Sequence, residues 1–348
     1  RVSPACAIPD LAGEITAALA GTGPALGLGE VRSTSAPSKI ALVIGTSGTT
    51  GMSKEVAFTA SALLASARAS NKFLGAKAGQ QWSLFLPLTH IAAVNVIIRS
   101  MELGTLPIDL REHQGEYPKV DFTSIVPTQL FRALNSDERL LRHLQSAQAV
   151  LVGGAALSPA LSQQAVTAGI NVVETYGMTE TSGGCIYNGK AIEGVEYSLN
   201  DKSLVQIRGS VMSETYLNAP ELYTLIDGWF ITNDLGEIKD GKLHILGRAD
   251  DVIISGGENL SLTAIEATLS IRYPEIEFAA FAVNDIQWGH ALHLAVVGQI
   301  GESEIDQYLE AALGAASKPK GIHHLEQLPL LGIGKVDRSA LAKMVGNE

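Results

Sequence analysis

Apolar runs that alternate with helix-forming segments constrain the fold of this chain most strongly. The strand-like runs are residues 40–44, 83–86, 106–110, 122–126, 150–152 and 170–174. Helical patterns that end near Leu74, Leu134 and Gly169 lie between them. Such alternation is typical of an α/β fold with a mainly parallel sheet covered by helices on both faces. Because ligands bind beyond the carboxyl ends of parallel strands, we expect the polar residues after these runs to share one site.

The first apolar run leads into a loop rich in glycine and hydroxyl groups. The loop is Thr46, Ser47, Gly48, Thr49, Thr50, Gly51, Met52, Ser53 and Lys54. Glycines allow sharp turns and close approach to a ligand, while backbone N–H groups, hydroxyls and a lysine suit phosphate oxygens. The loop is not a Walker motif, because two residues separate Gly51 from Lys54. We predict a phosphate-binding loop, with a flexible linker as the alternative.

The composition argues against several classes of partner. The chain has 348 residues, 25 of them basic and 36 acidic, and its net charge of −11 disfavours nucleic acid and anionic membranes. Two cysteines, Cys6 and Cys185, provide no disulfide framework, so we expect a cytoplasmic protein. The apolar stretch at 91–98 is too short to cross a bilayer, and we expect no membrane insertion. The sequence leaves open whether the chain acts alone or as a homodimer.

The second half of the chain changes pattern. Residues 202–246 alternate in short strands with turns at Asp227-Gly228 and Asp240-Gly241, which predicts a small β subdomain. A polar break at 247–251 precedes about 100 residues, the size of a small α+β domain. We therefore predict two domains, at 1–247 and 252–348, joined by the short segment 248–251.

Five motifs occur in a fixed order along the chain. They are Thr46–Lys54, Tyr176–Glu180, Trp229–Gly236, Gly247–Asp251 with Ser255–Asn259, and Pro329–Arg338. Together they resemble the adenylate-forming superfamily of acyl-CoA synthetases, peptide-synthetase adenylation domains and luciferases, over nearly the whole chain. The resemblance implies a large N-terminal domain with mainly parallel sheets and a small, mobile α+β C-terminal domain.

Other features resemble one subgroup, the short 2-succinylbenzoate–CoA ligases of actinobacterial menaquinone synthesis. They are the lack of an extra region before the phosphate loop, the segments 124–130 and 151–157, and the pairing of His90 with Arg99. The phosphate loop departs from the superfamily at Ser53, where Pro is usual, and at Glu55, where Gly is usual.

The resemblance implies that ATP, Mg²⁺ and coenzyme A take part in the reaction. A carboxylate attacks the α-phosphate of ATP to give an acyl-adenylate and pyrophosphate, and the CoA thiol then displaces AMP. Lys335 is implied to bridge the attacking carboxylate and the α-phosphate. Glu180, next to Thr179, is implied to hold Mg²⁺. The alternatives are a solvated loop lysine and a carboxylate at a helix start.

The resemblance also implies a nucleotide site. Asp234 would accept from the ribose hydroxyls and Arg248 would support ribose or phosphate, although the two could form only a surface ion pair. The residues implied to lie near the adenine are Gly153, Gly154, Ala155, Tyr176 and Gly177. A plain tight turn is the alternative for that segment.

The acyl pocket is expected between residues 90–99 and 181–185. Arg99 lies in an apolar helical stretch, where an unpaired cation is costly, and a second substrate carboxylate such as that of 2-succinylbenzoate would satisfy it. An internal Asp or Glu partner is the alternative for Arg99, and a core histidine is the alternative for His90. The other expected acyl-site residues are Ser182, Gly183 and Gly184.

A hinge is implied at Asp250, about which the C-terminal domain rotates between the two half-reactions. Ser255, Gly256 and Gly257 would border the CoA channel; a simple linker is the alternative. The sequence thus predicts a 2-succinylbenzoate–CoA ligase. A ligase for another aromatic or fatty acid and a non-catalytic nucleotide sensor are the rival interpretations.

Overall fold

The computed structural model describes residues 1–46, 53–285, 288–330 and 336–345. The chain divides into two compact units. The first comprises Arg1–Ala156, Ala165–Ser198 and Gln206–Ile231, and the second comprises Leu157–Gln164, Leu199–Val205 and Thr232–Glu348. The predicted hinge at 248–251 lies inside the second unit in this division, so the predicted domain boundary stays a prediction.

The apolar run that precedes the glycine-rich loop lies in a small, mainly antiparallel sheet. Its strands are, in spatial order, β1 (Leu26–Leu28), β2 (Ile40–Thr46), β3 (Lys54–Thr59) and β13 (Thr215–Tyr216). Only β1 and β2 run parallel. The loop therefore connects two antiparallel strands and does not lead into a helix. Strand β3 was not among the predicted elements; most of its residues are buried.

A second sheet of the first unit is the predicted parallel sheet. The spatial order is β10 (Lys190–Ala191), β9 (Gly183–Tyr187), β8 (Val172–Met178), β7 (Ala149–Val152), β6 (Phe122–Ile125), β4 (Trp82–Leu84) and β5 (Ile108–Asp109). The strands from β8 to β5 are parallel, while β9 and β10 are antiparallel. Every residue of β6 and β7 is buried, as expected for strands covered on both faces.

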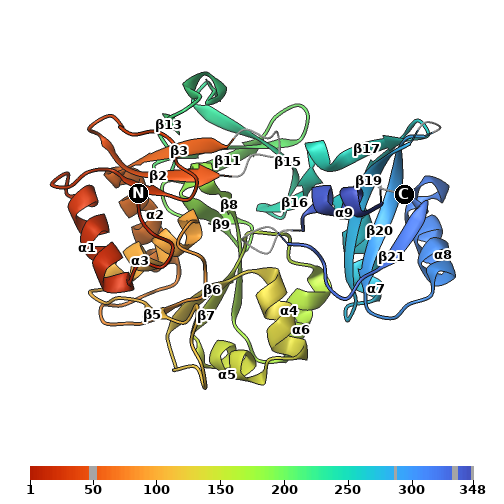
Figure 1. Cartoon of the computed structure of the whole chain (residues 1–348), viewed down its shortest axis with the longest axis horizontal. Coiled ribbons are helices and arrows are strands. Elements are labelled where there is room, and N and C mark those ends of the chain that lie inside the picture. The colour runs from red at the N-terminus through yellow and green to blue at the C-terminus, as the bar shows by residue number, and fades with distance from the viewer. Residues whose placement is uncertain (47–52, 286–287, 331–335, 346–348) are drawn as a thin grey trace. The chain divides into compact units, whose positions relative to one another are not determined.

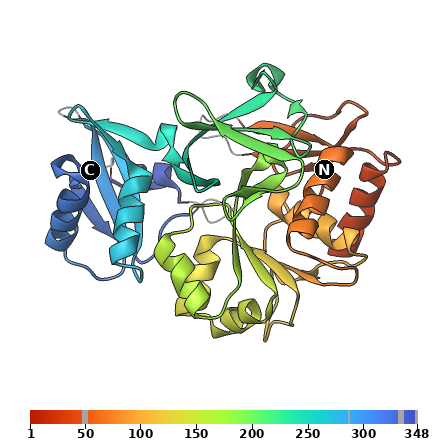
Figure 2. The same cartoon turned by 180° about the vertical axis from the view of Figure 1, so that it is seen from behind.

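Helices cover this sheet. They are α1 (Ile8–Leu19), α2 (Ala60–Phe73), α3 (Ile91–Glu102), α4 (Pro127–Asn135) and α5 (Glu138–Ser146); α6 (Pro159–Thr167) follows β7 along the chain. Figure 1 shows α1–α3 on one side of β6 and β7 and α4 with α5 on the other, and Figure 2 shows the same grouping from behind. Thr59 caps α2, since its side chain accepts from the Ala62 N–H at 3.2 Å. No described helix combines the length and apolar character needed to span a membrane.

The predicted β subdomain forms a third sheet. Its path is β11 (Val195–Leu199), β12 (Leu204–Gly209), β15 (Trp229–Lys239) and β14 (Leu225–Ile226), and β16 (Lys242–Arg248) pairs with β15; the 3₁₀ turn η2 is Pro220–Leu222. Both residues of Asp227-Gly228 and of Asp240-Gly241 have positive φ. These are the left-handed angles of a two-residue hairpin turn, so both predicted turns are confirmed.

The second unit contains a further sheet with helices on its two faces. The spatial order is β18 (Glu258–Ser261), β17 (Val252–Ser255), β20 (Gly289–Val297) and β19 (Glu277–Asp285), with β21 (Gly321–His324) parallel to β20. The other elements are η3 (Ala249–Asp251), α7 (Leu262–Arg272), α8 (Glu302–Leu313), η4 (Ala315–Ser317) and α9 (Arg338–Val345). Along β19, Phe278 and Ala280 pack with α7 and α8, while Ala279 and Phe281 pack with α9. Because side chains alternate between the two faces of a strand, β19 contributes to a hydrophobic core on each face of the sheet.

Candidate active site

The base of the phosphate loop is held by β2, β3 and the segment after β13. The hydroxyl of Thr46 donates to the Lys54 carbonyl at 3.2 Å. Asn218 contacts the returning strand twice, since its Nδ2 donates to the Ser53 carbonyl at 2.7 Å and its Oδ1 accepts from the Glu55 N–H at 2.9 Å. The loop residues Ser47, Gly48, Thr49, Thr50 and Gly51 lie outside the described residues. The described ends of the loop are therefore well ordered by hydrogen bonds on both strands.

Glu55, the residue that replaces the usual glycine, has a defined structural partner. Its side chain is buried, and Oε1 accepts from the backbone N–H groups of Arg32 and Ser33 at 2.6 and 3.1 Å. Burial alone would raise the pKa of this carboxyl, but the hydrogen bonds from Ser33 and Arg32 outweigh it and hold the pKa below its usual range. Glu55 thus ties the segment before β2 to the strand that leaves the phosphate loop.

The Tyr176–Glu180 motif ends strand β8 and forms the turn η1 (Thr179–Thr181). Gly177 is required by close packing, because a Cβ there would lie 2.1 Å from the Gly183 carbonyl oxygen. The Thr181 hydroxyl accepts from the Met178 N–H at 2.9 Å. The turn places Thr179 and Glu180 at the carboxyl end of the parallel strand, as predicted for a ligand site.

Tyr216 connects this turn to the phosphate loop. Its hydroxyl donates to Oε1 of Glu180 at 2.6 Å. The ammonium of Lys54 lies 3.5 Å from the same hydroxyl and 4.6 Å from the centroid of the tyrosine ring. The structure therefore brings together Lys54 and Glu180, which sequence analysis placed in one site, through a residue that sequence analysis missed.

The glycine pair after β7 lies next to the end of β8. A Cβ on Gly153 would lie 2.2 Å from the Thr175 hydroxyl oxygen, so only glycine fits there, and Gly154 has a positive φ of 84°. Gly154 and Ala155 are exposed, and Tyr176 is half-buried. These residues follow two neighbouring parallel strands, which is the arrangement expected for one side of a ligand site.

The expected acyl-site residues lie where α3 meets the start of β9. His90 is the residue before α3 and is half-buried. Asn95 of α3 donates to the Ser182 carbonyl through Nδ2 and is 1% exposed, and its Oδ1 has no partner among the described residues. The Ser182 hydroxyl donates to the Val211 carbonyl at 2.7 Å, so this side chain shapes the turn. Gly183 and the half-buried Gly184 follow it, and Gly183 has a positive φ of 86°.

Arg99 is buried in α3 and contacts two strands of the parallel sheet. It is 3% exposed, its Nη2 donates to the Tyr187 hydroxyl at 3.0 Å, and its guanidinium carbon lies 5.3 Å from the Trp82 ring centroid. Trp82 begins parallel strand β4, and Tyr187 ends β9, which runs antiparallel to β8. Trp82 lies at the start of the parallel strands, whereas Tyr187 pairs with Thr175, which is level with Gly153 at the carboxyl end of β7. Among the described residues no Asp or Glu pairs with Arg99 and its Nε has no hydrogen-bond partner, so its contact with a substrate carboxylate stays a prediction.

Asp234 and Arg248 face each other across the β15–β16 pair of the second unit. Their charged atoms are 3.8 Å apart, but Arg248 bonds Asp250 more closely, at 2.6 and 2.5 Å from its Nε and Nη2. The hydrogen bond to Asp250 raises the pKa of Arg248, and the bond from Arg248 lowers the pKa of Asp250. Arg248 therefore restrains Asp250, the residue predicted as the hinge.

The segment predicted to border the CoA channel is a tight turn between β17 and β18. Ser255 is buried, whereas Gly256 and Gly257 are exposed and have positive φ values of 59° and 88°. A Cβ on Gly256 would lie 2.6 Å from the Trp288 ring. Packing against Trp288 thus accounts for Gly256, and the left-handed backbone angle accounts for Gly257. Lys335 lies outside the described residues.

The donor set around Glu180 fits Mg²⁺. Among the described residues, no three His, Cys, Asp or Glu side chains gather into a metal cage. Mg²⁺ does not need such a cage when phosphates are present, because it keeps several waters and takes one or two carboxylates with phosphate oxygens. Glu180 offers one carboxylate whose Oε1 is already oriented by Tyr216, beside the base of the phosphate loop.

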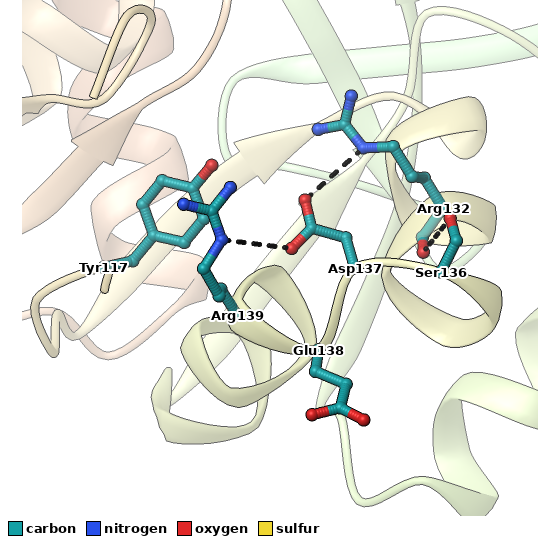
Figure 3. A pocket seen from close by; sticks show the side chains of 6 residues that line it. All are labelled: Tyr117, Arg132, Ser136, Asp137, Glu138 and Arg139. Carbon is teal, nitrogen blue, oxygen red and sulfur yellow. Dashed lines mark hydrogen bonds and ion pairs between the residues drawn. The ribbon is translucent and has the colours of Figure 1, made fainter. Parts of the chain in front are cut away.

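A polar hollow on the first unit lies outside this group of residues (Figure 3). Arg132 and Arg139 both approach the carboxylate of Asp137, at 3.7 and 3.9 Å, and Arg139 lies 5.4 Å from the Tyr117 ring centroid. None of the residues predicted from the motifs lines this hollow. One carboxylate and one aromatic face compensate the two arginines, so we interpret the hollow as part of the packing of α4 and α5.

The fold is that of an α/β protein, in which Tyr216 contacts both Lys54 and Glu180. The sequence pattern of the family described as "AMP-binding enzyme" matches residues 9–214, over half of the chain. The chain belongs to this family of adenylate-forming, AMP-forming acid–thiol ligases. The fold and family predicted from the motifs are confirmed.

Several named proteins are similar to this chain over most of its length. The chain is 36% identical over 333 residues to a "Probable 2-succinylbenzoate–CoA ligase" of Mycobacterium tuberculosis, covering 89% of this chain and 85% of the relative. It resembles the o-succinylbenzoate CoA synthetase of Bacillus subtilis in complex with its acyl-adenylate intermediate, with a TM-score of 0.73 and 26% identity, over 86% of this chain and 68% of that one. E. coli MenE with a bound analogue matches with a TM-score of 0.70 and 26% identity, over 100% and 82% of the two chains.

Proposed function

We propose that this chain is an ATP-dependent 2-succinylbenzoate–CoA ligase of menaquinone biosynthesis. The substrate carboxylate would attack the α-phosphate of ATP and release pyrophosphate, and the CoA thiol would then attack the acyl carbon and release AMP. The observation that carries the proposal is the joining of Lys54 and Glu180 through Tyr216, which assembles a cation and a carboxylate at the phosphate loop. The names of the relatives support the choice of acid.

The first half-reaction brings two anions together, so its catalysis depends on charge neutralisation and positioning. Lys54 and the loop N–H groups would neutralise the outer phosphates, and Lys335 would bridge the attacking carboxylate and the α-phosphate. Asp234 would accept from the ribose hydroxyls, with Arg248 beside it. The segment Gly153–Ala155 and Tyr176 would lie along the adenine.

Glu180 would hold Mg²⁺, which supplies charge neutralisation across the phosphate oxygens when bound. The fit rests on the chemistry of the donor set, since one oriented carboxylate beside a phosphate loop is what this ion uses in phosphate sites. Thr179 precedes Glu180 in η1 and would line the same end of the strand.

A second candidate exists for the acid that the enzyme would activate. Arg99 donates to Tyr187 and lies against Trp82, so its charge is compensated in part without a second substrate carboxylate. Asn95 is buried beside Ser182 and Gly183, so the expected acyl site contains a neutral polar group there. This supports, as the second candidate, an aromatic or fatty acid with a single carboxylate and the same adenylating chemistry.

Thioester formation would follow a change of backbone angles at Asp250. Release of the Arg248–Asp250 pair would accompany that change, because the pair restrains the same segment. Ser255, Gly256 and Gly257 would border the path of the pantetheine arm.

A panel of carboxylic acids with ATP, Mg²⁺ and CoA tests the proposal, with the product identified by its mass. We expect 2-succinylbenzoyl-CoA as the favoured product over the thioesters of benzoate and medium-chain acids. Faster turnover of benzoate would reject the proposed acid in favour of the second candidate. Absence of pyrophosphate release with every acid would reject the ligase and support a nucleotide sensor.

A further inference from the structure

Tyr216 stands between the two opposite charges of the predicted phosphate and metal site. Its side chain is 2% exposed, and its hydroxyl lies 2.6 Å from Glu180 Oε1 and 3.5 Å from Lys54 Nζ. We propose that Tyr216 is a positioning residue that keeps Lys54 and Glu180 from pairing with each other, so that the ammonium stays available to phosphate and the carboxylate to Mg²⁺. This inference rests on the proposed function.

The hydroxyl orients the carboxylate. A free glutamate side chain samples several rotamers, and the loss of this freedom on ordering opposes metal binding. The hydrogen bond to Oε1 removes much of this freedom in advance and leaves Oε2 for a ligand. A carboxylate oxygen can only accept, so the Tyr216 hydroxyl is the donor in this hydrogen bond.

The ring orients the ammonium. Lys54 lies over the ring at 4.6 Å from its centroid, within the range of a cation–π contact. Among the described residues, Lys54 takes part in no ion pair with a carboxylate, although Glu180 accepts from the same tyrosine. A lysine in contact with Glu180 would be neutralised by it. A neutral aromatic ring holds the cation without cancelling its charge.

The backbone around Tyr216 is well restrained. Strand β13 pairs with β3, which places Tyr216 opposite Val56, and the Leu217 N–H donates to the Glu55 carbonyl at 2.7 Å. The rings of Tyr216 and Tyr223 pack edge to face, with centroids 5.2 Å apart. The hydroxyl of Tyr216 therefore keeps a fixed position relative to the strand that carries Lys54.

Binding of ATP with and without Mg²⁺ tests the inference, because calorimetry needs neither acid nor CoA. The variants are Tyr216→Phe, Tyr216→Met and the matched control Tyr223→Phe, whose hydroxyl donates to the Ser213 carbonyl at 2.6 Å and contacts neither charge. We expect the gain in ATP affinity that Mg²⁺ provides to fall about ten-fold in both Tyr216 variants, the loss typical of one hydrogen bond to a charged group. In Tyr223→Phe the gain stays within about two-fold of the wild type.

Two measurements distinguish a positioning role of Tyr216 from a general structural role. Thermal unfolding should show Tyr216→Phe and Tyr223→Phe both folded at the assay temperature, because each keeps its ring and loses only the hydrogen bonds of one hydroxyl. In a Glu180→Gln background, Tyr216→Phe should cause no further loss of the Mg²⁺ effect. An unchanged Mg²⁺ effect in whichever Tyr216 variant folds, or losses that add to those of Glu180→Gln, would overturn the role of Tyr216.

The outcome is separable from that of the proposed function. A wild-type protein that binds ATP more tightly with Mg²⁺, together with a Tyr216→Phe variant that does so equally, overturns the inference and leaves the ligase intact. Failure of the acid panel rejects the ligase whatever the variants show. ATP binding by the wild type that does not respond to Mg²⁺ overturns both the inference and the role of Glu180.

Discussion

Replacement of Glu55 by glutamine tests whether this buried carboxylate anchors the phosphate-loop strand. The substitution keeps size and one carbonyl acceptor but removes the charge that accepts from the N–H groups of Arg32 and Ser33. A hydrogen bond to a charged group contributes about 1.5–3 kcal/mol and a neutral one about 0.5–1.5 kcal/mol. With two such bonds, we expect the free energy of unfolding of the first unit to fall by about 2 kcal/mol.

Thermal unfolding and hydrogen exchange measure this effect at two levels. A loss of about 2 kcal/mol corresponds to a lower melting temperature by roughly 4–8 °C for a unit of this size. The amides of Arg32 and Ser33 should exchange faster in Glu55→Gln, because they lose the charged acceptor. Glu214→Gln is the matched control: Glu214 pairs with Lys39 at an exposed position on the neighbouring strand and should change stability by less than about 1 kcal/mol.

The effect of Glu55 should depend on pH with a definite sign. Its folded-state pKa lies below the ordinary value of 4.5. The ionised group therefore stabilises the fold above pH 4.5, and this contribution is lost as the pH falls below 4.5 through the lower folded-state value. The stability difference between wild type and Glu55→Gln should shrink in that window. A difference that is absent at pH 7, or that grows on acidification, refutes the reasoning.

Three further predictions follow from the site and the first helix. Lys335→Ala should abolish pyrophosphate release but spare thioester formation from supplied acyl-adenylate; equal loss of both steps contradicts its assigned role. Asp250→Pro should slow chiefly the thioester step in single-turnover assays, whereas Asp250→Ala, which loses only the pair with Arg248, should slow it less; identical kinetics would remove the hinge proposal. Gly13→Ala should raise the free energy of unfolding by about 0.5–1 kcal/mol, because Gly13 is an exposed interior position of α1 with open space at the added Cβ, and a lower melting temperature would oppose this.

Features with local causes were predictable from the sequence. Thr59 caps α2, and Asp227-Gly228 and Asp240-Gly241 form hairpin turns, because caps and turns depend on residues only a few positions apart. The alternation of apolar runs and helical patterns identified the strands of the parallel sheet for the same reason. The motif order along the chain was enough to predict the family, which the comparisons confirm.

Features with long-range causes were not predictable in this way. The run that ends at Thr46 looked like a strand of the parallel sheet, but it pairs with β3 in a separate antiparallel sheet. Tyr216 lies 162 positions after Lys54, and its role depends on the pairing of β13 with β3. No local pattern in the sequence specifies such a pairing, because strand register depends on which surfaces become buried together.

Arg99 shows what can be predicted from the free-energy cost of burying a charge, and what cannot. The apolar surroundings of Arg99 correctly indicated that its charge must be compensated. The partners, however, are the Tyr187 hydroxyl and the Trp82 ring, which come from two strands distant in sequence. A requirement for a partner can be read from the sequence, but the identity of the partner depends on packing.

By itself, the sequence determined the types of element, the turns, the family and the list of residues able to carry adenylating chemistry, since each depends on short segments. Only the tertiary structure decided which of those residues meet. Glu180 and Lys54 lie near each other because two strands far apart in sequence bring Tyr216 between them, and Arg99 is held by Tyr187 and Trp82 from two other strands. The chemistry a residue can perform depends on its own side chain. Which side chains lie close together depends on how apolar surface is buried over the whole fold.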